Sequence, residues 1–182
     1  MAKPKKISEG YLERAALHYL GRFSSTEANL RAVLERKVRR RLEEGQEVSS
    51  EHRGWIADVA QKCVKYGYVD DALYAKSRYE SLLRKGKPLR VISQDLRYKG
   101  VPQDIIQELF AAIQGEPEVD IDLSAAAAYA KRRRFGPFRR ADRYSEEKVE
   151  KEKAAMMRAG FPFQMVQRIL DATEEEIIQL LP

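Results

Sequence analysis

Residues 65–110 read KYGYVDDALYAKSRYESLLRKGKPLRVISQDLRYKGVPQDIIQELF and contain three helical patterns joined by two short turns. Asp70 can cap the first helix, because its carboxylate can accept hydrogen bonds from the free N–H groups of the first turn. Gly86 and Gly100 end the first and second helices, and each is followed two residues later by a proline that opens the next helix. Each helix has one apolar stripe, so the three must pack together into a compact unit of roughly 40–50 residues.

Four short motifs occur in order within this stretch. They are Gly67-Tyr68-Val69-Asp70-Asp71, Tyr74-Ala75, Arg84-Lys85-Gly86 and Leu96-x-x-Lys99-Gly100-Val101. Together, in a small basic helical chain, they resemble the signature of the RecX family, whose members regulate the bacterial recombinase RecA. The resemblance implies an all-α fold, arranged as an elongated tandem array of three three-helix repeats.

The composition is that of a soluble, helix-rich chain. Of its 182 residues, 43% are hydrophobic and 34% are charged. No apolar run approaches the roughly 20 residues that cross a bilayer, and the basic start of the chain lacks the apolar segment of a secretory signal. Cys63 is the single cysteine, so no internal disulfide can form. These features predict a cytoplasmic protein without membrane contact.

The net charge of +6 and the sequence pI of about 9.4 indicate attraction to polyanions. The partner could be nucleic acid or an acidic protein surface, and net charge alone does not separate the two. A basic pI is also common among soluble proteins without such a partner.

The patterns along the chain predict six segments. These are a disordered basic arm (1–8), a first three-helix repeat (9–67), a second repeat (68–113), a linker (114–122), a third repeat (123–172) and a C-terminal tail (173–182). Ser24 and Glu27 have the spacing of a capping box, which predicts the start of the second helix. Thr173 and Glu176 have the same spacing, so the tail is expected to form a short helix that docks on the third repeat or frays.

Two parts of the chain repeat each other without a gap. Lys99-Gly100-Val101-Pro102 is followed by four apolar residues, and Ala159-Gly160-Phe161-Pro162 is followed by four apolar residues at the same spacing. Internal repetition of this kind predicts units that stack, each touching mainly its neighbour. The first repeat has the same helix order but lacks the Gly-x-Pro turn, so its membership is inferred.

The sequence offers no arrangement suited to catalysis. It has no glycine-rich phosphate loop, its two histidines, His18 and His52, are far apart in the chain, and one cysteine excludes a zinc finger. The adjacent acids Asp70 and Asp71 are explained as a helix cap and a first-turn partner of the helix dipole. We therefore expect no enzyme activity, no cofactor and no metal site, and we expect Cys63 to lie in the core.

Basic residues form the remaining candidate sites. The turn cluster consists of Arg84, Lys85, Lys87 and Arg90, and Arg97 and Lys99 on the next helix extend it. The arginine cluster consists of Lys131, Arg132, Arg133, Arg134, Arg139, Arg140 and Arg143, with Phe135, Phe138 and Tyr144 interleaved. A third run, residues 36–41, is equally well explained as a solvated helix face. Arginine forks suit carboxylates or phosphates, whereas Phe135 and Phe138 are expected to pack between helices rather than to stack on bases.

The resemblance implies a regulator that binds the RecA filament on single-stranded DNA and inhibits ATP hydrolysis, strand exchange and co-protease activity. Its setting would be DNA repair, homologous recombination and the SOS response. On this interpretation the RecA- or DNA-binding residues are Arg84, Lys85, Lys87, Arg90, Arg97, Lys99, Arg132, Arg133, Arg134, Arg139 and Arg140, in a chain expected to be a monomer.

Two alternatives remain: a stand-alone DNA-binding protein of tandem helix-turn-helix-like units, and a helical scaffold for another acidic protein. A recognition helix needs outward polar or basic residues near its start. The third helix of the central unit instead offers Asp104 and Glu108 beside two glutamines, which disfavours specific duplex recognition.

Overall fold

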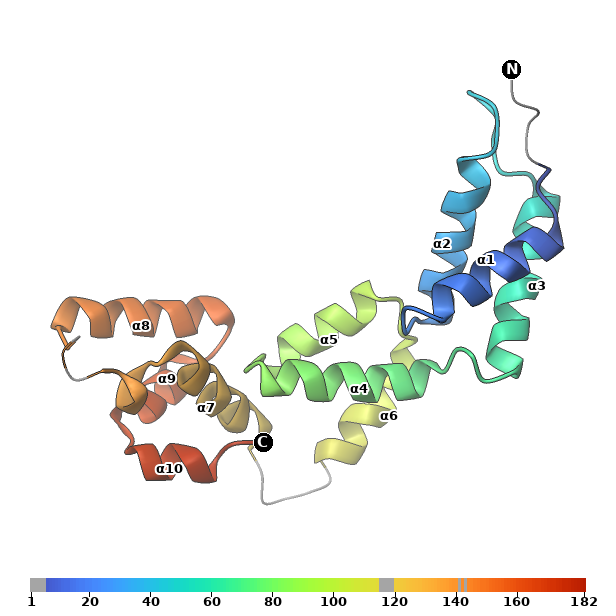
Figure 1. Cartoon of the computed structure of the whole chain (residues 1–182). Coiled ribbons are helices and arrows are strands. Elements are labelled where there is room, and N and C mark those ends of the chain that lie inside the picture. Colours follow the sequence, from blue (N-terminus) through green and yellow to red (C-terminus); the bar gives the residue numbers. More distant parts are fainter. Residues whose placement is uncertain (1–5, 115–119, 141, 143) are drawn as a thin grey trace. The chain divides into compact units, whose positions relative to one another are not determined.

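The computed structural model describes residues 6–114, 120–140, 142 and 144–182, and all regular structure in these residues is helical. The α-helices are α1 (Glu9–Leu20), α2 (Glu27–Arg39), α3 (Ser50–Lys65), α4 (Asp71–Arg84), α5 (Leu89–Tyr98), α6 (Gln103–Gln114), α7 (Ile121–Arg133), α8 (Glu146–Ala159), α9 (Phe163–Asp171) and α10 (Glu174–Gln179), and a 3₁₀ turn, η1, spans Gly136–Phe138 (Figure 1). The predicted all-α class is confirmed. Most of the predicted basic arm and of the predicted linker lies outside the described residues.

Side chains cap several of the helix starts, and the caps at Asp70 and Thr173 are the predicted ones. The Asp70 carboxylate accepts a hydrogen bond from the Leu73 N–H at 2.8 Å and so caps α4. Ser49 caps α3 and Ser145 caps α8 in the same way. The capping box at the start of α10 is also present, with the Thr173 and Glu176 side chains each bonded to the other residue's backbone N–H. Local side-chain chemistry therefore sets these boundaries.

The predicted capping box of Ser24 and Glu27 is wrong. Thr26 caps α2, because its hydroxyl accepts from the Asn29 N–H at 3.1 Å and also donates to the Lys99 carbonyl at 2.6 Å. The second bond joins residues far apart in the chain, so it adds stability that a local pattern cannot show. Glu27 instead pairs with Arg31 one turn along the helix.

Contacts between residues divide the chain into two compact units. Unit 1 comprises residues 1–75 and 97–107, and unit 2 comprises residues 76–96 and 108–182. The limits fall inside α4, α5 and α6, so the central three-helix stretch contributes to both units. The proposed repeat boundaries remain a prediction from the sequence.

Each unit has its own apolar core. In unit 1, α1, α2 and α3 bury a core that includes Cys63, as predicted; its largest fully buried members are Leu12, Leu30, Leu34, Val38 and Val59. In unit 2 the core lies among α7, α8, α9 and α10, which are gathered together in Figure 1; its members with no exposed surface include Met156, Val166, Ile169 and Ile177. Burial of Ile177 shows that the C-terminal helix docks rather than frays.

The internal repetition extends to burial. Residues 101–110 and 161–170 have the same sequence of buried, half-buried and exposed positions, except that Leu109 is half-buried where Ile169 is buried. The glycines that precede them, Gly100 and Gly160, both adopt positive φ angles, of 80° and 107°. The two helix pairs therefore present the same face to their cores.

A pair of equivalent contacts also recurs. In unit 1, Asp71 at the start of α4 accepts from the Glu27 N–H that begins α2, at 2.9 Å. In unit 2, Asp122 at the start of α7 accepts from the Leu89 N–H that begins α5, at 2.8 Å. In each case a carboxylate at the start of one helix caps the start of another helix from the side, so the same contact joins α4 to α2 and α7 to α5.

The two Gly-x-Pro turns pack on those same helix starts. A Cβ added to Gly100 would lie 2.6 Å from the Cβ of Ala28 in α2. One added to Gly160 would lie 3.3 Å from Cγ of Pro88, directly before α5. The close approach, together with the positive φ angles, explains why both turns carry glycine.

Candidate functional site: a basic hollow on unit 2

The end of α7, the turn η1 and one face of α8 enclose a hollow of about 520 Å³. We call this feature the basic hollow. It is lined by Arg133, Arg134, Phe135, Arg139, Arg140, Lys148, Lys151, Glu152, Ala155 and Arg158. Seven of these side chains are cationic and one is anionic, so the formal charge of the lining is 7 − 1 = +6. Such a surface is suited to a ligand with several negative charges.

One wall is the exposed face of α8. Lys148, Lys151, Ala155 and Arg158 follow one another at helical spacing, and the three cationic residues among them are exposed. Residues three, four and seven apart lie on the same side of a helix, so the three charges form a row along α8.

The other wall is where α7 ends. Arg134 adopts the left-handed conformation, with a φ of 58°, and the N–H of Phe135 donates to the Ala130 carbonyl at 2.9 Å. This arrangement stops the helix and turns the chain into η1. Arg133 and Arg134 are exposed on either side of the point where the helix stops.

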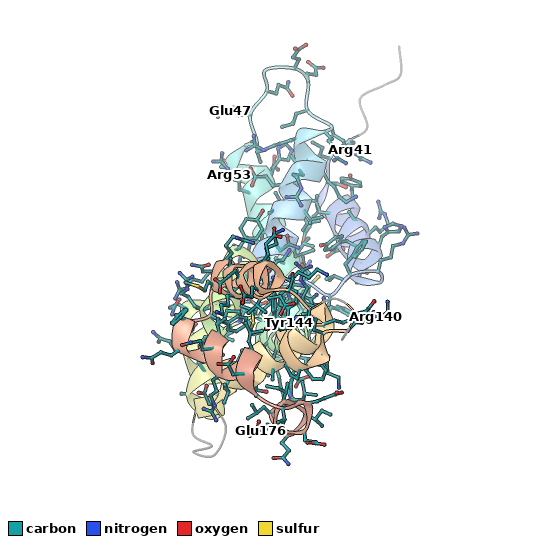
Figure 2. The ribbon with its side chains drawn as sticks, turned by 90° about the vertical axis from the view of Figure 1, so that its left-hand side faces the viewer. Arg41, Glu47, Arg53, Arg140, Tyr144 and Glu176 are labelled. Atoms are coloured by element: carbon teal, nitrogen blue, oxygen red, sulfur yellow. The ribbon has the colours of Figure 1, made fainter. Side chains whose placement is uncertain are left out.

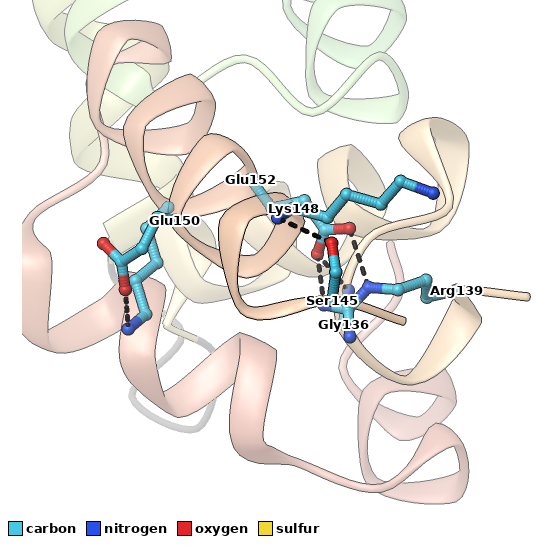
Figure 3. Close-up of polar contacts among 7 residues, drawn as sticks. Gly136, Arg139, Ser145, Lys148, Glu150 and Glu152 are labelled. Carbon is cyan, nitrogen blue, oxygen red and sulfur yellow. Dashed lines mark hydrogen bonds and ion pairs between the residues drawn. The ribbon is translucent and has the colours of Figure 1, made fainter. Parts of the chain in front are cut away.

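A buried ion pair connects the two walls. Glu152 of α8 accepts from Arg139 Nε at 2.8 Å, from Arg139 Nη2 at 2.5 Å and from the Gly136 N–H at 3.0 Å (Figure 3). The side chains of Arg139 and Glu152 are only 13% and 9% exposed. Hydrogen bonding to Glu152 raises the pKa of Arg139, so the guanidinium stays charged. Its fork is already occupied, which distinguishes Arg139 from the other predicted binding residues.

The turn cluster packs beside the arginine cluster within unit 2. Gly86 has a φ of 68°, and a Cβ added there would lie 2.5 Å from the Tyr129 Cα in α7. Arg132 and Arg133 follow Tyr129 by about one helical turn, with their guanidinium carbons 5.9 Å and 6.0 Å from the centre of its ring. The structure therefore brings together two predicted clusters that are more than 40 residues apart in the sequence.

The side chains of the turn cluster differ in exposure. Arg84, Lys85 and Arg90 are exposed, and Lys87 is half-buried. A Cβ added to Gly160 would lie 3.6 Å from Arg90 Nη2, so the Arg90 guanidinium lies beside the turn that follows Arg158. The cluster is thus also close to the end of α8.

Arg97 and Lys99 belong to unit 1. Nε of Arg97 donates to Gln103 Oε1 at 3.1 Å, and Lys99 Nζ lies 5.7 Å from the centre of the Tyr98 ring. Neither side chain is among the residues that line the basic hollow.

The other predicted basic residues have varied surroundings. In the run 36–41, Arg39 pairs with Glu35 at 2.6 Å, and the Arg41 guanidinium carbon lies 3.4 Å from the centre of the Tyr11 ring. These contacts within unit 1 favour the interpretation of the run as a solvated helix face over that of a binding site. Arg140 is exposed at the edge of unit 2 (Figure 2). Arg143 lies outside the described residues.

The aromatic residues of the arginine cluster divide in two. Phe135 and Phe138 pack against the core of unit 2, as predicted. Tyr144, which is labelled in Figure 2, is 69% exposed. The centre of its ring lies 5.5 Å from the Arg139 guanidinium carbon.

The sequence interpretation missed the cations of α8. Lys148, Lys151 and Arg158 alternate in the sequence with Glu146, Glu147 and Glu150, so the segment reads as a mixed, solvated helix. Their spacing of three and seven residues was the available indication that the cations share a face.

Among the described residues no group of three or more metal-ligating side chains is found, and none of their helices combines the length and the apolar composition of a membrane span. The arrangement can hold anions by charge and hydrogen bonding.

Comparisons with known proteins identify relatives along nearly the whole chain. The family model "RecX, second three-helix domain" matches residues 70–109. The regulatory protein RecX of Myxococcus xanthus is 36% identical over 170 residues, covering 93% of this chain and 89% of the relative. That of Agrobacterium fabrum is 32% identical over 179 residues, covering 98% and 92%. The crystal structure of RecX from Lactobacillus salivarius has a TM-score of 0.60 at 18% identity, covers 94% of this chain and 97% of its own, and supports the fold alone.

Proposed function

Since this chain belongs to the RecX family of regulatory proteins, we propose that it binds the RecA filament on single-stranded DNA and inhibits its ATP hydrolysis, strand exchange and co-protease activity. Its relatives are named regulatory proteins rather than enzymes. It would act as a cytoplasmic monomer in recombination, DNA repair and the SOS response.

The observation that carries this proposal is the basic surface of unit 2. The turn cluster, the end of α7 and the row of cations on α8 are brought together by the contacts at Gly86 and Gly160. A recombinase filament on DNA offers both phosphates and acidic side chains, and a concentrated positive surface accelerates and stabilises binding to such a target. A ligand that spans neighbouring protomers can block the change that accompanies hydrolysis.

Specific recognition of duplex DNA has less support. In α6 the acidic residues Asp104 and Glu108 are exposed, and like-charge repulsion from phosphates disfavours placing this face in a groove. A stand-alone DNA-binding role is therefore the alternative outcome of the test below rather than a second proposal.

The test is the DNA-dependent ATPase of the same organism's RecA, titrated with this protein well below equimolar amounts. We expect hydrolysis to fall at that ratio, because one bound molecule must then affect many protomers. Unchanged hydrolysis together with tight binding to bare DNA would refute filament regulation and support the stand-alone role.

A variant of the turn cluster connects the test to the structure. Replacing Arg84, Lys85, Lys87 and Arg90 with Ala should weaken filament binding and leave helicity and melting temperature unchanged. Three of the four side chains are exposed, and the backbone of the turn between α4 and α5 is fixed by the contact of Gly86 with Tyr129, so their loss should not disturb the fold. Unaltered affinity would remove this cluster from the interface.

A further inference from the structure

We propose that the basic hollow of unit 2 binds the phosphates of single-stranded DNA rather than the carboxylates of a protein surface. The inference rests on the proposed function, in which the strand is the one carried by the filament. It assigns a binding role to α8, which neither the family resemblance nor the sequence pattern singled out.

The charge of the hollow is concentrated and nearly uncompensated. Its one carboxylate, that of Glu152, accepts three hydrogen bonds from Arg139 and Gly136, so that its charge is neutralised within the wall. Lys151 pairs with Glu147, but both side chains are more than 70% exposed, and such pairs contribute little. The surface of a folded protein partner usually mixes acidic with basic side chains. Such a partner would leave many of the cations of the hollow without an opposite charge.

The length of the row matches a strand of nucleic acid. Lys148 and Arg158 are ten residues apart on α8, which is about 15 Å at 1.5 Å per residue. A stacked strand has a charge about every 3.4 Å, so about four phosphates fit in that length. The cations at the end of α7 face the same hollow from its other wall, so a strand within it meets positive charge on both sides.

An aromatic side chain lines the same hollow as the row of cations on α8. Phe135 is half-buried, lines the hollow and has the Arg133 guanidinium carbon 5.6 Å from the centre of its ring. Its main contacts are with the core, but Phe135 also lines the hollow, and an aromatic side chain there can take part in sequence-independent stacking with a base. Phosphates along the cations and a base against the ring account for the lining, whereas a carboxylate has no use for the aromatic face.

The ion pair of Arg139 and Glu152 has a positioning role. It joins η1 to α8 and so sets the distance between the walls (Figure 3). Arg139 is not expected to form a bidentate contact with the strand, because its Nε and Nη2 already donate to Glu152.

The experiment compares two triple variants of the full chain with equal loss of charge. The hollow variant is K148Q/K151Q/R158Q, and the control variant is R36Q/R40Q/K65Q, whose residues are exposed in unit 1. Binding to a fluorescent oligothymidylate is measured by anisotropy over a series of salt concentrations, and inhibition of the RecA ATPase is measured beside it.

We expect the hollow variant to bind the oligonucleotide roughly ten- to a hundred-fold more weakly. The slope of log K against log salt should become shallower by about 2, since each lost phosphate contact contributes about 0.7 for a single strand. The control variant should change affinity by less than about two-fold, because the same net charge is lost from residues that do not line the hollow.

Three results would overturn the inference. The wild-type chain could fail to bind the oligonucleotide, or both variants could weaken equally, which would make binding a matter of net charge. Alternatively, the hollow variant could keep oligonucleotide binding and lose only the filament, in which case the hollow binds protein carboxylates and the proposed function still holds. A fourth result separates the two proposals. If the hollow variant loses oligonucleotide binding but even the wild type does not inhibit the ATPase, the inference is supported and the proposed function is refuted.

Discussion

Replacing Glu152 with Ala should destabilise unit 2 more than any other single loss of a charge discussed above. The substitution removes the acceptor of three hydrogen bonds, at 2.5, 2.8 and 3.0 Å. It leaves the guanidinium of Arg139, whose side chain is 13% exposed in the intact protein, without its partner, and leaves the Gly136 N–H without its acceptor. The cost is therefore mainly that of an uncompensated charge within the protein.

The expected loss in the free energy of unfolding is about 2–4 kcal/mol. Removing one partner of a fully buried pair typically costs about 3–5 kcal/mol. The lower range applies here because Arg139 borders the basic hollow and can turn toward water. In E152Q one amide oxygen can still accept a hydrogen bond, so about half of that loss is expected.

The assay is urea unfolding of the wild type, E152A, R139A and the double variant, followed by far-ultraviolet circular dichroism. Residues in direct contact should show a coupling energy of at least about 1 kcal/mol in this cycle. Trp55, the single tryptophan, lies in α3 of unit 1, so its fluorescence follows the other unit in the same samples. The loss should be larger by circular dichroism than by fluorescence.

The reasoning would be refuted if E152A lost less than about 0.5 kcal/mol, or if the coupling energy were near zero. Either result would mean that the pair behaves as a solvated surface pair. Arg139 would then be as free as its neighbours to bind a ligand.

Three further predictions concern backbone and burial. G86A should lower the free energy of unfolding by about 2–4 kcal/mol, because the added Cβ would meet the backbone of α7 at a position whose φ is positive. The control G67A has a similar φ but open space around it, so it should lower the free energy of unfolding by only about 1–2 kcal/mol in the same urea titrations. Burial raises the pKa of Asp71, so folding disfavours its ionised form, and the contribution of Asp71 to stability falls as the pH rises through the folded pKa. D71N keeps the hydrogen-bond acceptor, so in urea titrations it should be at least as stable as the wild type at pH 7, with the difference vanishing near pH 4. D71A removes the acceptor and should lose about 1 kcal/mol at either pH. Burial also raises the pKa of the Cys63 thiol, so alkylation by iodoacetamide at neutral pH should be many-fold slower in the native chain than in urea, and equal rates would place this thiol at the surface.

Local features were readable from the sequence because their causes are local. Asp70 caps the helix that follows it directly, and the alternation of buried and exposed positions after Gly100 and Gly160 follows from helical spacing alone. The order of the helices and the repeat of the last two could be predicted for the same reason.

What the sequence could not show were contacts between distant residues. The hydroxyl of Thr26 also donates to a carbonyl 73 positions away, Asp71 was interpreted only as a partner of its own helix dipole, and Asp122 was assigned to the linker. The candidate site has the same character. The arginine cluster could be recognised because its basic residues lie close together in the sequence. The cations of α8 are interspersed with glutamates in the sequence, and only the helix places them on one side.

The recurring contact between helix starts bears on how such a chain can change over evolutionary time. Asp71 and Gly100 hold the start of α2 in the way that Asp122 and the turn at Gly160 hold the start of α5. A segment of this kind carries both the residues that contact the segment before it and the helix start that the next segment contacts. It can therefore be duplicated or deleted in the gene without further substitutions in the neighbouring segments. Descendants can therefore differ in length by whole modules, and each added module also offers new surface on which another cluster of charge can evolve.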